Sequence, residues 1–144
     1  MKKLLIPAAV IAVGAGAFFL ATQQQETLNI YNWSDYIAED TIANFEAETG
    51  IKVTYDVYDS NEILEAKMMA GSSGYDLVVP TGDFLARGRE AGAYQDMDVS
   101  RLANYANQDE EVQQIANAQM EADNAGIVYM WGTTGIAFNE AMVA

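Results

Sequence analysis

Residues 27–58 read TLNIYNWSDYIAEDTIANFEAETGIKVTYDVY, and this stretch decides the fold class. Apolar and polar side chains alternate strictly from Ile51 to Val57, which predicts a strand with one buried face. The preceding segment from Ile37 to Gly50 repeats apolar residues at helical spacing, with Asp40 as a plausible N-cap and the glycine as the helix stop. Thr27 to Ile30 predicts a short opening strand. Strand, helix and strand in this order form the repeating unit of parallel α/β sheets.

The same alternation continues along the chain. Asp59 or Ser60 caps a second predicted helix that ends at Gly71. Residues 75–79 then form an apolar strand of the kind buried on both faces of a parallel sheet, and Pro80 closes it. A third helix follows from about residue 84 to 91. The predicted order is therefore βαβαβα, a parallel sheet with helices on its faces.

The last third of the chain is less regular. Residues 96–125 are polar throughout and predict one or two short surface helices, whereas residues 127–131 predict a strand and residues 136–139 further extended structure. A sheet that stops at Ala144 would keep a long exposed edge, which native proteins avoid. We therefore expect the sequence to be the N-terminal fragment of a longer protein; the alternative is a small complete domain.

The N-terminus has the layout of a secretory signal. A basic start, Met1-Lys2-Lys3, precedes an uncharged and almost wholly apolar run from Leu4 to Ala21. Ala15-Gly16-Ala17 offers a cleavage site, and an uncleaved N-terminal anchor is the alternative, since 18 such residues are near the lower limit of a membrane span. We assign residues 1–21 to the signal and residues 22–144 to a folded lobe.

Composition excludes several classes of function. The 144 residues contain no cysteine and no histidine, which excludes disulfides, a thiol-linked lipid anchor, His-based metal sites and the common nucleophilic triads. Without Lys2 and Lys3, five basic residues face 21 acidic ones, a formal charge of −16. This balance argues against nucleic-acid binding, which needs clustered Lys and Arg. Export without disulfides fits a protein of the bacterial periplasm.

Two loops carry the chemistry of a candidate site. Ligands of open α/β sheets bind beyond the carboxyl ends of the strands, where the strand order reverses. If the order begins 2-1-3, the loops after the first and third strands border the same crevice. These are Trp33-Ser34-Asp35-Tyr36 and Thr81-Gly82-Asp83-Phe84. Both combine aromatic, hydroxyl and carboxylate groups, which suit a small organic ammonium ion.

Each of these residues also has a purely structural interpretation. Ser34 or Asp35 could cap the first helix, and on the residues alone a helix cap is favoured for Asp83. For Asp35, cap and ligand contact carry equal weight. The aromatic side chains of Trp33 and Tyr36 could belong to the core, and Thr81 could simply end a strand. Neither loop contains a Gly-rich phosphate-binding pattern.

Several segments together resemble the periplasmic polyamine-binding proteins of ABC transporters, and the putrescine-binding branch most closely. The resemblance runs from about Leu28 to Asn139. It is carried by YNWSDYI at 31–37, FEAETGIKV at 45–53, YDVYDSNE at 55–62, MAGS at 69–72, YDLVVP at 75–80 and YMWGTTGI at 129–136. It implies a type II periplasmic-binding-protein fold with two lobes, of which this chain holds most of the first.

The resemblance also implies a function and a set of site residues. The protein would be a monomeric receptor, not an enzyme, that uses no cofactor and delivers putrescine or spermidine to permease subunits in the inner membrane. Trp33 would pack on the methylene chain of the ligand, and Ser34 and Asp35 would bind an ammonium group. The remaining predicted contacts are Tyr36, Thr81, Asp83 and Phe84. Asp83 departs from the small polar residue expected in the putrescine branch, so its carboxylate either recruits a further amine or caps the helix.

Two other functions stay open. The first is a receptor of the same architecture for a different amine, an amino acid or a sugar; a carboxylate at Asp35 would reject anionic solutes. The second is a flavodoxin-like or nucleotide-binding α/β domain. The missing phosphate-binding loop and the export signal both argue against the second.

Overall fold

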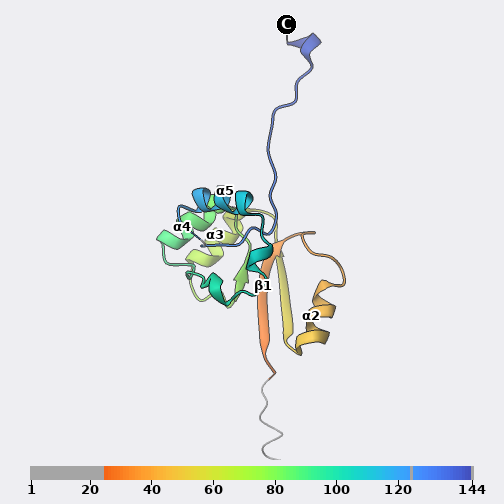
Figure 1. The fold of residues 1–144 in the computed structure, drawn as a ribbon, viewed down its shortest axis with the longest axis vertical. Coiled ribbons are helices and arrows are strands. Elements are labelled where there is room, and N and C mark those ends of the chain that lie inside the picture. The colour runs from red at the N-terminus through yellow and green to blue at the C-terminus, as the bar shows by residue number, and fades with distance from the viewer. Residues whose placement is uncertain (1–24, 124, 144) are drawn as a thin grey trace, which may run out of the picture.

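The computed structural model describes residues 25–123 and 125–143, so the predicted signal segment lies outside the described residues. A parallel sheet has α2 on one side, while α3, α4 and α5 gather on the other (Figure 1). The elements are β1 (Thr27–Trp33), α2 (Thr41–Thr49), β2 (Lys52–Tyr58), α3 (Asn61–Met69), β3 (Leu77–Val78), α4 (Gly82–Glu90), η1 (Val99–Arg101), η2 (Tyr105–Asn107), α5 (Glu110–Met120) and η3 (Glu140–Met142). None of the described helices is long and apolar enough to cross a membrane.

The strand order is β2-β1-β3, which is the order on which the expected closeness of the loops after the first and third strands depended. β1 pairs with β2 over its whole length, from Thr27 opposite Lys52 to Trp33 opposite Tyr58. β1 is three residues longer than predicted, so residues 31–33 belong to the strand and not to the loop. The reason is that the backbone of residues 31–33 pairs with that of residues 56–58 in β2.

β3 is shorter than the predicted strand 75–79. Its ladder covers Leu77 and Val78; before it the Asp76 N–H donates to the Asn29 carbonyl at 2.9 Å, and side chains add further bonds on either side. The Asp76 carboxylate accepts the backbone N–H of Asn29 at 2.8 Å. At the other end, the carbonyl of Val79 accepts side-chain donors from β1 and β2. The backbone groups are thus satisfied without continuing the strand.

α2 begins at Thr41, directly after the predicted N-cap Asp40 and four residues into the predicted segment 37–50, and it ends as predicted at Gly50, whose φ of 74° is left-handed. Asp40 holds the N-cap position, but its carboxylate accepts from the Asn44 side chain at 3.2 Å and not from a backbone N–H. Every residue of α2 stays at least partly exposed. The helix therefore depends on polar contacts at its C-terminal end.

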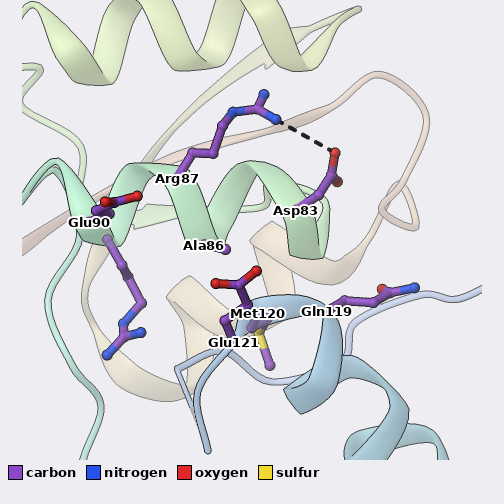
Figure 2. A pocket seen from close by; sticks show the side chains of 8 residues that line it. Asp83, Ala86, Arg87, Glu90, Gln119, Met120 and Glu121 are labelled. Atoms are coloured by element: carbon purple, nitrogen blue, oxygen red, sulfur yellow. Dashed lines mark ion pairs between the residues drawn. The ribbon is translucent and has the colours of Figure 1, made fainter.

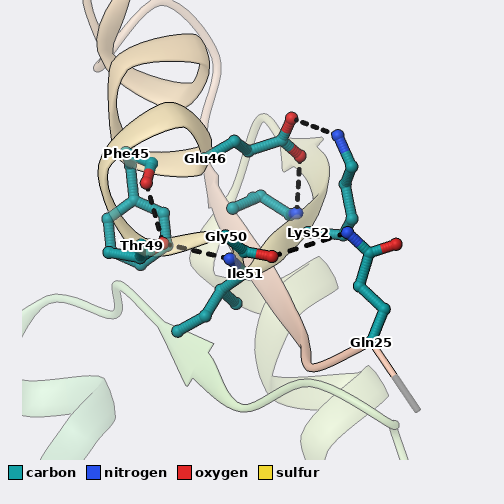
Figure 3. Close-up of polar contacts among 8 residues, drawn as sticks. Gln25, Phe45, Glu46, Thr49, Gly50, Ile51 and Lys52 are labelled. Atoms are coloured by element: carbon teal, nitrogen blue, oxygen red, sulfur yellow. Dashed lines mark hydrogen bonds and ion pairs between the residues drawn. The ribbon is translucent and has the colours of Figure 1, made fainter. Parts of the chain in front are cut away.

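Glu46 provides those contacts (Figure 3). Its carboxylate accepts the backbone N–H of Val53 at 2.9 Å and pairs with the Lys52 ammonium at 2.9 Å. These bonds lower the pKa of Glu46, with the backbone bond as the larger cause. Thr49 adds a local turn, because its hydroxyl donates to the Phe45 carbonyl and accepts the N–H of Ile51. Together they join the end of α2 to the start of β2.

The core lies between the sheet and α3. It consists of Tyr31, Tyr58, Leu64 and Met68, and Leu64 is only 1% exposed. The tyrosine rings meet at 4.8 Å between centroids. α3 begins as predicted, because the Ser60 side chain accepts the N–H of Ile63.

α4 begins at Gly82, two residues before the predicted start. Gly88 is the close-packed point of this helix: a Cβ placed there would lie 2.1 Å from the Tyr94 ring. The chain can turn back against α4 only because this position has no side chain. α5 packs against α4. It lies within the polar stretch 96–125, for which one or two short surface helices were predicted.

The predicted strand at residues 127–131 is wrong. Gln113 of α5 holds the start of this segment, donating to the Gly126 carbonyl at 2.9 Å and accepting the N–H of Val128 at 3.1 Å. Beyond Tyr129 the chain runs away from the body, no strand of the described residues pairs with it (Figure 1), and Ile136 is 93% exposed. Alternating apolar residues form a strand only when another backbone pairs with them.

Candidate functional site

The carboxyl ends of the three strands meet at one edge of the sheet. The Trp33 indole N–H, at the end of β1, donates to the Val79 carbonyl at 2.9 Å. The Tyr58 hydroxyl, at the end of β2, donates to the same carbonyl. The segments after β1 and β3 are thereby joined. The loops at residues 33–36 and 81–84 were predicted to lie near each other. The two bonds to Val79 and the strand order β2-β1-β3 support that prediction.

Trp33 serves as a structural residue and keeps part of its ring accessible. Its centroid lies 4.8 Å from that of Tyr58 and 6.1 Å from that of Tyr36. Trp33 is half-buried and Tyr36 is 40% exposed. Because one ring edge is anchored through the indole N–H, the orientation of the indole face is set before any ligand binds.

Ser34 and Asp35 do not cap α2, which starts six residues beyond Asp35. The Ser34 N–H donates to the Tyr58 carbonyl at 3.3 Å, and its hydroxyl donates to the Asp59 carboxylate at 2.8 Å. Asp35 has a φ of 62°, a left-handed conformation that few residues other than glycine adopt. Among the described residues its carboxylate has no hydrogen-bond or ion-pair partner. A strained, exposed and unpaired carboxylate is suited to contact a ligand.

Thr81 and Asp83 form a unit of their own. Thr81 is the N-cap residue of α4, and its hydroxyl donates to the Asp83 carboxylate at 2.6 Å. The Thr81 N–H donates to the Asn61 side chain at 3.2 Å, which joins this loop to the start of α3. Asp83 therefore lies in the first turn of α4, two residues beyond the N-cap, and is not the cap residue that the sequence favoured.

The Asp83 carboxylate is held by its own helix. The Thr81 hydroxyl lowers the pKa of Asp83 most, followed by the N–H groups of Asp83 and Phe84 and the charge of Arg87. The Arg87 guanidinium lies 3.9 Å from that carboxylate and 4.0 Å from the centroid of the Phe84 ring, and it also pairs with Glu65 at 3.0 Å. Arg87 is therefore paired rather than simply solvated, and one face of Phe84 already carries a cation.

An open depression of about 610 Å³ lies between α4 and the end of α5 (Figure 2). Asp83 and Arg87 line it from α4, and Gln119, Met120 and Glu121 line it from the region of α5. Asp83 is the member of the candidate site that also lines this depression. Because the depression contains both members of an internal ion pair, we do not assign the ligand to it.

The structure adds three residues that the sequence did not select. Asp59 contacts Ser34, Asn61 contacts Thr81, and the Tyr129 hydroxyl donates to the Tyr36 carbonyl. Asp59 and Asn61 follow β2, whose carboxyl end lies at the same edge, so strand order was a usable signal for them. Tyr129 is 93 residues from Tyr36 and had no such signal. Within the described residues, no group of three or more acidic side chains is arranged to hold a metal ion.

The family described as bacterial extracellular solute-binding protein matches residues 40–144. The chain belongs to this family. It is 53% identical over 136 residues to the putrescine-binding periplasmic protein PotF of Escherichia coli, covering 94% of this chain and 36% of that protein. It is 48% identical over 131 residues to the putrescine-binding periplasmic protein SpuD of Pseudomonas aeruginosa, covering 91% and 36%.

Solved structures agree. A putative spermidine/putrescine ABC transporter from Listeria monocytogenes has a TM-score of 0.64 at 36% identity, covering 70% of this chain and 30% of that one. The Tp0655 (TpPotD) lipoprotein of Treponema pallidum has a TM-score of 0.62 at 35% identity, covering 67% and 30%. The predicted type II periplasmic-binding-protein fold is confirmed, and the described residues form part of one lobe. The chain spans about a third of the length of the curated relatives it matches.

Proposed function

We propose that this chain forms one wall of the ligand site in the substrate-binding protein of a polyamine ABC importer. The observation that carries the proposal is the pairing of an anchored indole with a free carboxylate: Trp33 is fixed through Val79, and Asp35 stands two residues further on without a partner among the described residues. An alkyl chain with ammonium ends needs both, a flat apolar face and an unpaired anion.

In this proposal Trp33 presents its ring to the methylene groups, and Asp35 and Ser34 receive one ammonium group. Tyr36 lines the same end. Thr81, Asp83 and Phe84 border the ligand from the loop after β3. A charged amine binds tightly only if its lost hydration is replaced by hydrogen bonds and paired charge. Bonds donated to Ser34 and a charge paired with Asp35 would provide that replacement.

The relatives support the ligand class. PotF and SpuD are named as putrescine-binding periplasmic proteins, and a further relative, 36% identical over 137 residues, is the spermidine/putrescine-binding periplasmic protein of Escherichia coli. We infer that this protein likewise acts in the periplasm as a monomer, reaches it through the signal at residues 1–21, hands its ligand to permease subunits and catalyses no reaction. In this proposal residues 22–144 form one lobe, and residues outside this chain complete the ligand site.

Calorimetry on the protein expressed from its complete gene tests this proposal. Putrescine or spermidine should bind, and Asp35→Asn should weaken binding by at least about 1.5 kcal/mol, the low end for a hydrogen bond to a charged group. Asparagine is the informative replacement because it removes the charge yet tolerates the left-handed backbone.

The matched control is Glu48→Gln. Glu48 is exposed near the end of α2, at the opposite edge of the sheet, so the variant removes one negative charge without touching the site. It should bind as the wild type does. Equal affinity in wild type and Asp35→Asn would refute the role of Asp35, and binding of a neutral sugar or amino acid in place of amines would assign the receptor to another solute.

A further inference from the structure

The two hydroxyl groups of the candidate site share one feature. The Ser34 hydroxyl lies 2.8 Å from a carboxylate oxygen of Asp59, and the Thr81 hydroxyl lies 2.6 Å from one of Asp83. A hydroxyl carries one proton and two lone pairs, whereas an ionised carboxylate can only accept. In both pairs the hydroxyl must therefore be the donor. Each hydroxyl already donates its proton to a carboxylate of the protein, so it can only accept a hydrogen bond from a ligand.

We propose that Asp59 is a positioning residue that turns Ser34 into an obligate hydrogen-bond acceptor, so that this wall selects ligands whose ends are hydrogen-bond donors. The inference rests on the proposed amine-binding function and adds a residue to it. Asp59 does not touch the ligand in this account; it acts through the Ser34 proton. Asp83 acts on Thr81 in the same way at the facing loop.

The surroundings of Ser34 leave no other role for its proton. Its backbone N–H is already bonded to the Tyr58 carbonyl, which fixes the side chain at the end of β1. Asp59 follows β2, and the parallel register that places Trp33 opposite Tyr58 also brings Ser34 beside Asp59. The register of the sheet thus brings the two side chains together, and the carboxylate, which can only accept, sets the direction of the hydrogen bond. A ligand with an acceptor end, such as an ether, meets lone pairs and is disfavoured.

The chemistry excludes ligands as well as selecting them. An ammonium group donates three hydrogen bonds and accepts none, so it complements a wall of acceptors. An ether or carboxylate end would need Ser34 to rotate and break its bond with Asp59. Charge alone, from Asp35 or Asp59, favours any cation but does not distinguish a donor from an acceptor at the same position.

A discrimination experiment separates these effects. We would measure the affinities of putrescine and of 4-methoxybutylamine, in which an ether oxygen replaces one amine, on the protein expressed from its complete gene. In Asp59→Ala the released Ser34 hydroxyl can donate to the ether. The ratio of the two dissociation constants should therefore narrow by about fivefold, the size of one neutral hydrogen bond.

Two further variants make the result specific. In a Ser34→Ala background the same Asp59→Ala change should leave the ratio of the two dissociation constants unaltered, because no Ser34 hydroxyl remains that could donate to the ether. Glu62→Ala removes an equal charge nearby in the first turn of α3, without a bond to Ser34, and should also leave the ratio unaltered.

The outcomes are distinct. If the wild type binds no amine, the proposed function fails and the inference fails with it. If the wild type binds putrescine but Asp59→Ala keeps the ratio, the inference alone is overturned. The same follows if the ratio narrows equally in the Ser34→Ala background or in Glu62→Ala, since Asp59 would then act through charge.

Discussion

The loops after β1 and β3 carry the same kinds of residue, yet the structure uses them differently. After β1, Asp35 is held in a left-handed conformation and its carboxylate has no partner among the described residues. After β3, the Asp83 carboxylate is bonded by Thr81 and approached by Arg87, and Arg87 also covers Phe84. The first loop holds Asp35 in a left-handed backbone conformation with an unpaired carboxylate, whereas in the second loop the Asp83 carboxylate is hydrogen-bonded and ion-paired within the protein. Preparation for a ligand therefore depends on partners and not on composition.

The largest expected contrast is in stability between the aromatic residues of the two loops. Trp33→Ala removes the contact with Tyr58 and the bond to Val79, and should lower the free energy of unfolding by about 2–3 kcal/mol, below the range for fully buried rings because Trp33 is half-buried. Phe84→Ala should cost about 1 kcal/mol, because it loses mainly the Arg87 contact. Urea unfolding followed by circular dichroism measures both; equal losses would contradict the contrast.

A smaller effect, of opposite sign in the two loops, is expected for glycine. Asp35→Gly relieves the left-handed backbone and should raise the free energy of unfolding by about 0.5 kcal/mol. Asp83→Gly places glycine in the first turn of α4 and removes a carboxylate at a helix N-terminus, and should lower it by about 1 kcal/mol. Thermal unfolding of the two variants side by side checks this. A loss of stability in Asp35→Gly would mean that the loop is unstrained.

The smallest expected effect is on how the free energy of unfolding depends on pH in the acid range. Because the pKa of Asp83 is lowered in the folded protein, its ionised form contributes stability above its ordinary pKa of 3.8, and this contribution is lost as the pH falls through the lowered value. Asp83→Asn should therefore lose slightly more stability at pH 7 than below pH 3. The side chain is 66% exposed, so the difference will be small.

Thr81→Val removes the largest cause of that shift and should reproduce part of the effect. Unfolding curves at several pH values measure it. An Asp83→Asn profile parallel to the wild type across the acid range would contradict the assignment.

Much of the fold was predictable because its signals are local. The alternation from Ile51 to Val57 coincides with β2 except for its first residue, Ser60 caps α3, and Gly50 ends α2 in the left-handed conformation. Turn and cap residues act within a few positions, so their chemistry can be read along the chain. The alternation of strands and helices predicted a parallel sheet, whereas the order 2-1-3 was a condition that only the structure met.

The predictions fail where a distant part of the chain decides the local structure. Residues 127–131 have the pattern of a strand, but no strand among the described residues pairs with them, so they stay irregular. Tyr31 to Trp33 lie beyond the predicted strand 27–30, yet pairing with β2 keeps them in β1. α2 starts directly after Asp40, the predicted cap, and the residues before Asp40 form a separate turn. The seven predicted ligand contacts stay predictions.

By itself, the sequence determined the class of the protein: a parallel α/β lobe with aromatic and acidic residues after β1 and β3, resembling polyamine-binding proteins. Only the tertiary structure decided which of those side chains have partners within the described residues and which do not. Hydrogen-bond partners come from other strands and helices, as Asp59 does for Ser34 and Arg87 does for Asp83. A carboxylate has the same charge at Asp35 and at Asp83, but folding gave partners to only one of them.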